Sequence, residues 1–182
     1  MRKVIAAFNM TLDGNCDHTA GLPDEVVHRH YSDLLDRSDV ILYGRTAYQL
    51  MEFWRTILEN PSGEKAMDTF AAAIDRIPKI IFSRSLKQVD WKSASLAERE
   101  LKETVELYKR QPGRDILIGS RSLIQQLMKL RLIDELQLCI HPVVAGKGTS
   151  LFEDMDRIVL RLVNTKRFDG GAIVLYYKQE AS

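Results

Sequence analysis

The sequence predicts an α/β fold, in which helices flank a mostly parallel central sheet that has an antiparallel C-terminal edge. Two observations predict it. Before residue 133, short apolar runs rich in β-branched residues alternate with segments of helical spacing, as in βα units whose strands are covered on both faces. Beyond residue 133, strand-like runs follow one another with no helical pattern between them. A length of 182 residues fits one domain spanning 1–182.

Apolar spacing gives the expected order of the elements. Central strands are expected at 4–8, 40–43, 80–82 and 116–118. Helices with one apolar face are expected around 27–35, 101–108 and 123–130. C-terminal strands are expected at 136–140, 158–163 and 172–177, with Asp169-Gly170-Gly171 as the hairpin turn that joins the last two. The stretch 59–64, with Pro61 and Gly63, is typical of a surface loop.

Charge and composition narrow the range of partners. The 26 Lys and Arg residues against 25 Asp and Glu residues leave a net charge of +1, which provides no field for nucleic acid or a membrane surface. No apolar stretch approaches the ~20 residues that span a bilayer, and the run at 1–10 is too short for a secretory signal, so a cytoplasmic protein is expected. Cys16 and Cys139 are far apart and lack CxxC partners, which predicts free thiols.

Three turns that follow predicted strands have residues suited to phosphate groups. Ligands of parallel sheets bind beyond the carboxyl ends of the strands. Gly, Arg and hydroxyl residues stand there at 119–122, 44–46 and 83–85, and Ser122 and Gln125 have the spacing of a capping box. Any one turn is also compatible with an ordinary cap and a solvated arginine. Together they favour a phosphorylated dinucleotide, and the candidate cofactor-binding residues are Gly44, Arg45, Thr46, Ser83, Arg84, Gly119, Ser120, Arg121, Ser122 and Leu123.

Three side chains are candidates for proton delivery in a reductase, namely Asp13, Asp24 and His28. Each also has a structural interpretation. Asp13-Gly14 is commonly a turn, and Asp24 suits the first turn of a helix because of the helix dipole. His28 and His30 are two residues apart, so a helix points them in different directions and no metal site is expected.

Several ordered motifs resemble those of the dihydrofolate reductase superfamily. Thr11-Leu12-Asp13-Gly14 matches the family's S-L-D-G, and 44–48 matches G-R-x-T-Y. The most specific stretches are 115–120, 132–135 and 141–148, followed by Leu151-Phe152. Within that superfamily the chain is most similar to small stand-alone proteins related to the reductase domain of the bacterial riboflavin-biosynthesis deaminase-reductase.

This resemblance implies a dihydrofolate-reductase-like fold and NADPH as cofactor. It places the adenosine 2′-phosphate and diphosphate region at 44–46 and 83–84, and the diphosphate at the 119–123 turn. Hydride would pass to a small heterocyclic or sugar-like substrate, as in dihydrofolate reductase or 5-amino-6-(5-phosphoribosylamino)uracil reductase. Three positions depart from the family pattern. Ala47 replaces Thr and leaves Thr46 to supply a hydroxyl, Thr11 replaces Ser, and Ser120 replaces the second glycine of a Gly-Gly pair.

An alternative from another class remains open: a non-catalytic nucleotide-binding or interaction protein that retains the fold. The three departures and the lack of an obvious acid favour it, and fold alone does not decide. Zinc-dependent deamination is excluded because the sequence has no H-x-E followed by P-C-x-x-C. Asp134-Glu135 and His141-Pro142 are interpreted as structural.

A homodimer is also expected. The last strand-like run has Ile173, Leu175 and Tyr177 on one face and Val174 and Tyr176 on the other. A small domain does not easily cover both faces of such an edge, whereas a two-fold interface buries it against a second copy. Relatives implied by the resemblance are commonly dimers.

Overall fold

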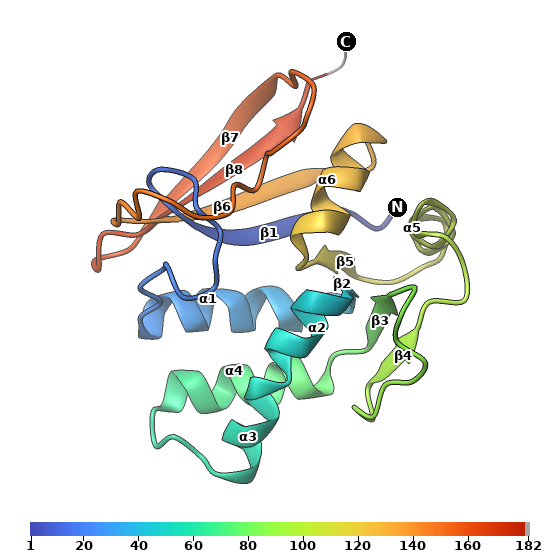
Figure 1. Cartoon of the computed structure of the whole chain (residues 1–182), viewed down its shortest axis with the longest axis horizontal. Coiled ribbons are helices and arrows are strands. Elements are labelled where there is room, and N and C mark those ends of the chain that lie inside the picture. Colours follow the sequence, from blue (N-terminus) through green and yellow to red (C-terminus); the bar gives the residue numbers. More distant parts are fainter. Residues whose placement is uncertain (181–182) are drawn as a thin grey trace.

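The computed structural model describes residues 1–180 and contains an eight-stranded sheet in the order β4-β3-β2-β5-β1-β6-β8-β7 (Figure 1). The strands are β1 (Val4–Thr11), β2 (Ser38–Gly44), β3 (Lys79–Phe82), β4 (Ala94–Leu96), β5 (Asp115–Ile118), β6 (Glu135–His141), β7 (Leu160–Arg167) and β8 (Ile173–Gln179). β4, β3, β2, β5, β1 and β6 are parallel, whereas β8 pairs antiparallel with β6 and with β7. The predicted α/β class and antiparallel C-terminal edge are therefore confirmed.

Six helices in the described part of the chain cover the two faces of the sheet: α1 (Glu25–Asp36), α2 (Arg45–Met51), α3 (Phe53–Glu59), α4 (Lys65–Arg76), α5 (Leu101–Arg110) and α6 (Arg121–Lys129). One apolar core joins α1, α2 and α4 to side chains such as Ile5 and Ala7 of β1. The other core joins α5 and α6 to Val4 and Ala6, the alternate residues of the same strand. This alternation is what a strand covered on both faces requires.

The hairpin predicted at 169–171 is present. The Phe168 backbone N–H donates to Ala172 O (2.9 Å), and Gly171 has a φ of +88°, a conformation that glycine adopts without strain. The loop predicted at 59–64 also forms, because α3 ends at Glu59 and α4 begins at Lys65.

The strand predicted at 158–163 is displaced, since β7 spans Leu160–Arg167. β7 is the edge strand, and nearly all its residues are exposed. Its first and last residues are therefore set by hydrogen-bonded pairing with β8, and the apolar pattern of the sequence does not report them. Both cysteines are buried free thiols, as predicted. None of the helices in residues 1–180 is long and apolar enough to cross a membrane.

Candidate functional site

The strand pairing has a gap at the carboxyl edge of the sheet, called the notch below, because β5 is shorter than the neighbouring strand β1. β5 pairs with β1 only from Val4 to Ala6, while β1 continues to Thr11 with β6 alone as its neighbour. On its other side β5 pairs with β2, whose last residue is Gly44. The turns that follow β2 and β5 therefore border the open side of β1.

The turns after β2 and β5 touch each other. A Cβ on Gly44 would lie 3.0 Å from Ser120 Oγ and 3.2 Å from Ser122 Oγ, so the missing side chain lets the turns approach closely. Gly44 and Ser120 are the N-caps of α2 and α6, and neither helix receives a hydrogen bond from a capping side chain. The first backbone N–H groups of α6 are thus available to an anion.

The capping box predicted from Ser122 and Gln125 is wrong. The helix begins at Arg121, so Ser122 lies inside its first turn. Gln125 Nε2 instead donates to Leu151 O (2.8 Å), which ties α6 to the segment that precedes β7. The Gln125 side chain, which local spacing assigned to the helix cap, thus bonds to a residue that is distant in sequence.

The packing of the core already requires glycine at position 119. A Cβ there would lie 2.7 Å from Cε1 of the buried Tyr43 and 3.3 Å from Cδ1 of Ile41. A substitution at Gly119 would therefore disturb the core, whether or not the backbone of Gly119 also contacts a cofactor.

The turns after β2 and β3 are linked by arginine and serine side chains. Arg45 Nη1 donates to Ser85 Oγ (3.0 Å), and the backbone N–H groups of Ser85 and Leu86 donate to Ser83 Oγ (3.2 and 3.0 Å). Arg84 is exposed and makes no hydrogen bond or ion pair within residues 1–180, and Thr46 is exposed in the first turn of α2. Two guanidinium groups without a carboxylate partner thus stand at neighbouring strand ends.

Arg121 and Leu123 direct their side chains elsewhere. Arg121 Nε donates to Ser150 O (2.7 Å), and its Nη2 pairs with Glu153 (2.6 Å). Leu123 is buried in the core beneath α6. At these two positions only the backbone is available to a cofactor.

Asp13 joins two loops. It accepts hydrogen bonds from Thr11 Oγ1 (2.5 Å) and from the backbone N–H groups of Ala145 (3.1 Å) and Gly146 (2.7 Å). These bonds, Thr11 first, lower the pKa of the Asp13 carboxyl to about 2. It is therefore ionised near neutral pH, with no proton to deliver.

Asp24 and His28 occupy the start of α1 but have different surroundings. Asp24 is the N-cap, and its Oδ1 accepts from the Val27 backbone N–H (2.9 Å), in agreement with its structural interpretation. The His28 ring packs against Trp54 (5.7 Å between centroids) and Phe70 (6.0 Å), and burial lowers its pKa. The side chains of Asp13, Asp24 and His28 make no hydrogen bonds to one another, and the bond from the His28 backbone N–H to Asp24 O (3.0 Å) belongs to the first turn of the helix.

Sequence reasoning missed a polar cluster on the α1 side of the notch. Tyr31 Oη donates to Asn9 Oδ1 (3.1 Å), and His141 Nε2 lies 3.0 Å from the same oxygen. The backbone N–H of Leu22 donates to His141 Nδ1 (3.3 Å). The available signal was Asn9 itself, a polar residue inside the apolar run of a central strand. Its partners lie on α1 and β6, out of reach of any spacing rule.

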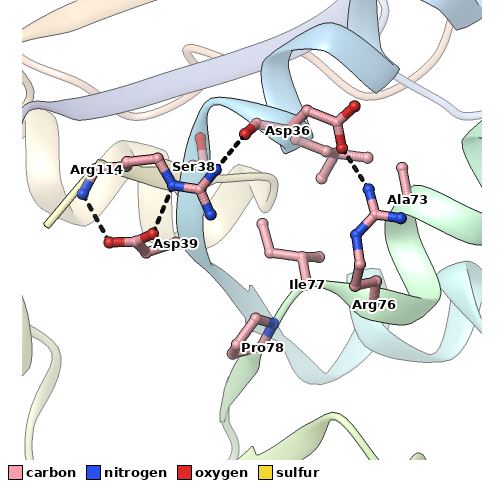
Figure 2. A pocket seen from close by; sticks show the side chains of 9 residues that line it. Asp36, Ser38, Asp39, Ala73, Arg76, Ile77, Pro78 and Arg114 are labelled. Atoms are coloured by element: carbon pink, nitrogen blue, oxygen red, sulfur yellow. Dashed lines mark hydrogen bonds and ion pairs between the residues drawn. The ribbon is translucent and has the colours of Figure 1, made fainter.

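A hollow of about 380 Å³ lies at the opposite edge, beside the amino ends of β2 and β3 (Figure 2). Its charged side chains are paired with one another. Arg114 Nε bonds to Asp39 (2.8 Å), and Arg76 Nη2 bonds to Asp36 (2.5 Å). Because these pairs leave no charged group free, the carboxyl edge is the better candidate site.

Comparison with known sequences identifies relatives over nearly the whole chain. Residues 2–174 match the family model described as RibD C-terminal domain. The chain is 35% identical over 181 residues to the uncharacterized protein YyaP of Bacillus subtilis (strain 168), a match that covers 97% of this chain and 94% of YyaP.

Two solved structures have the same fold. A putative riboflavin biosynthesis protein from Shewanella sp. PV-4 has a TM-score of 0.73 at 16% identity, covering 98% of this chain and 99% of its own. A dihydrofolate reductase from Enterococcus faecalis, complexed with NADP(H), has a TM-score of 0.62 at 13% identity, covering 98% and 97%. The dihydrofolate-reductase-like fold predicted from the sequence is confirmed.

Proposed function

Because the chain belongs to the RibD C-terminal domain family, we propose that it is an NADPH-dependent reductase of a small heterocyclic or sugar-like molecule. The observation that carries the proposal is the meeting of the Gly44 and Ser120 turns, flanked by Arg45 and Arg84. These groups fit a phosphorylated dinucleotide, because free N–H groups and guanidinium groups without carboxylate partners are the donors that phosphate oxygens take.

Each part of the turn cluster has a distinct role in this proposal. The backbone N–H groups from Ser120 to Leu123 hold the diphosphate, and Ser122 Oγ adds a hydroxyl beside them. Arg45 and Arg84, with Ser83 and Thr46, hold the adenosine phosphate. NADPH supplies the hydride when bound. The protein then has to place the acceptor and deliver a proton.

For proton delivery we propose His28 over the two carboxylates. Asp13 is fixed as an anion between two loops, and Asp24 caps α1. His28 makes no hydrogen bond to residues 1–180 through its ring nitrogens, and burial favours its neutral form. A neutral imidazole accepts a proton from water and passes it on.

The alternative, a nucleotide-binding protein without hydride transfer, is favoured by one observation. Two of the three predicted proton donors are engaged in structural hydrogen bonds. Oxidation of NADPH, followed by its absorbance in the presence of candidate substrates, separates this alternative from the reductase.

Fluorescence titration with NADPH and NADH tests the proposal directly. NADPH should bind at least about tenfold more tightly than NADH, since a charge-assisted contact to the 2′-phosphate is worth roughly 1.5–3 kcal/mol. Absence of binding at millimolar NADPH would overturn the proposal.

We also propose that two copies of the chain associate through β7. The expectation that the last strand forms the edge is wrong, because β8 lies between β6 and β7. The edge strand is β7, which exposes its backbone and the side chains of Leu162 (48% exposed) and Val163 (39%). Pairing of β7 with the β7 of a second copy, about a two-fold axis, would give this backbone hydrogen-bond partners and would cover these side chains. Light scattering should then give about twice the 20.8 kDa of one chain, and a strictly monomeric species would contradict the dimer.

A further inference from the structure

β1 is a central strand of the sheet (Figure 1). Asn9 belongs to this strand and is nevertheless exposed. It follows Ile5 and Ala7 on the face covered by α1, and it comes after the last pairing between β1 and β5. Its side chain is exposed on that face of the sheet, near the unpaired end of β1. A polar side chain that is exposed and also held by hydrogen bonds is placed to meet a ligand.

The orientation of the Asn9 amide follows from the hydrogen bonds of His141. The Leu22 backbone N–H donates to His141 Nδ1, so that nitrogen is unprotonated and the ring proton is on Nε2. Nε2–H consequently donates to the atom 3.0 Å away, which must be the oxygen of Asn9. His141 is fully buried, and burial lowers its pKa, which agrees with a neutral ring.

The oxygen of Asn9 is thus held by two donors, Tyr31 Oη from α1 and His141 Nε2 from β6. These bonds prevent the amide from turning over. The other arm of the amide, Nδ2, donates to no atom of residues 1–180. Both of its hydrogens are available in a side chain that is open to solvent, so a ligand can take them without displacing a protein partner.

We infer that Asn9 is a specificity-determining residue, whose Nδ2 donates a hydrogen bond to a carbonyl oxygen or unprotonated ring nitrogen of the molecule reduced. The inference rests on the proposed function, because it assigns the notch beside the diphosphate turn to the hydride acceptor. A ligand with an N–H group next to Asn9 Nδ2 would place two hydrogen-bond donors against each other. The substrate class is therefore a ring or carbonyl compound that presents an acceptor to β1.

The test is a titration with uracil, a neutral ring with two carbonyl acceptors, with and without saturating NADPH. In the wild type, uracil should shift the side-chain ¹⁵N–¹H signals of Asn9 along a saturating curve. Asn9→Asp keeps an oxygen for Tyr31 and His141 but removes the donor, and should weaken uracil binding at least about tenfold. Its NADPH affinity should stay within about twofold of the wild type.

Asn60→Asp is the matched control, because it makes the same change and adds the same charge at an exposed residue that follows α3, away from β7. It should bind uracil like the wild type. Thermal melting shows whether Asn9→Asp folds. If it does not fold, Asn9→Ala, which has no side-chain donor, takes its place in the titration.

The outcomes separate the two proposals. Failure of the wild type to bind NADPH overturns the reductase, while the uracil titration without NADPH still tests Asn9. Unchanged uracil affinity in Asn9→Asp, or no uracil-induced shift at Asn9 in the wild type, overturns the inference. A variant that loses NADPH affinity as strongly as uracil affinity also overturns it, because Asn9 would then serve the cofactor.

Discussion

The two edges of the sheet differ in their unpaired arginines, because the carboxyl edge pairs Arg121 with Glu153 but leaves two others without a carboxylate partner. At the amino edge, Arg76 and Arg114 are each bound to an aspartate across the hollow shown in Figure 2. At the carboxyl edge, Arg45 bonds only to a serine hydroxyl, and Arg84 bonds to nothing within residues 1–180. A guanidinium with a carboxylate partner is already neutralised, whereas one without is free to take an anion. The pairing of charges thus indicates the binding edge better than the presence of a hollow does.

The largest expected effect belongs to the amino edge and concerns stability alone. Lys79 is buried in β3, and its Nζ donates to Asp75 O, Ile77 O and Ser93 Oγ while it lies 4.1 Å from the centre of the Trp91 ring. Lys79→Met leaves these acceptors unpaired and should lower the free energy of unfolding by about 3 kcal/mol. Urea denaturation measures the loss. NADPH affinity should not change at a temperature where the variant is folded.

The pH dependence of the free energy of unfolding should also differ between the two edges of the sheet. Burial lowers the pKa of His30 from 6.5 to about 4, so between these values the unfolded chain binds a proton that the folded chain does not. Stability should therefore fall as the pH drops from about 6.5 towards 4, by a total on the order of 3 kcal/mol. His30 contacts Phe168 in the hairpin, so this loss concerns the carboxyl side.

The amino edge responds only at lower pH. The hydrogen bond from Arg114 lowers the pKa of Asp39 below 3.8, so the contribution of Asp39 is retained until the pH falls through that lowered value. Denaturation curves from pH 7 to 4 should be much flatter for His30→Phe than for the wild type. The remaining slope comes from His28 and His141, whose pKa burial also lowers. An unchanged slope in His30→Phe would show that His30 titrates normally in the folded chain.

Substitution of the arginines without a carboxylate partner should affect cofactor binding at the carboxyl edge only. Arg45→Ala and Arg84→Ala should each weaken NADPH binding about tenfold or more, since a charge-assisted hydrogen bond is worth roughly 1.5–3 kcal/mol. NADH affinity should stay nearly constant, because NADH lacks the 2′-phosphate. Arg114→Ala at the amino edge is the matched control and should leave both affinities unchanged. Equal losses for NADPH and NADH would show that the arginine acts on the fold.

The position of the strand-end turns could be predicted from the sequence, because all of them follow parallel strands. Parallel strands end at one edge, so residues that follow 40–43, 80–82 and 116–118 must gather there. The rest depends on contacts between distant segments. Asp13 is bound by Ala145 and Gly146, and Asn9 by His141, across more than a hundred residues. No local pattern reports such contacts, which is why the sequence left both interpretations of Asp13 open and did not identify Asn9.

The smallest effect is expected at the hollow of the amino edge. Arg76 and Asp36 form an ion pair between side chains that are 67% and 54% exposed. Water screens such a pair, so Arg76→Ala should change the free energy of unfolding by less than about 0.5 kcal/mol. A double-mutant cycle with Asp36→Ala measures the coupling between the two side chains. NADPH titration of Arg76→Ala should match the wild type, and a loss of affinity there would move the cofactor to the hollow and reverse the assignment of the two edges.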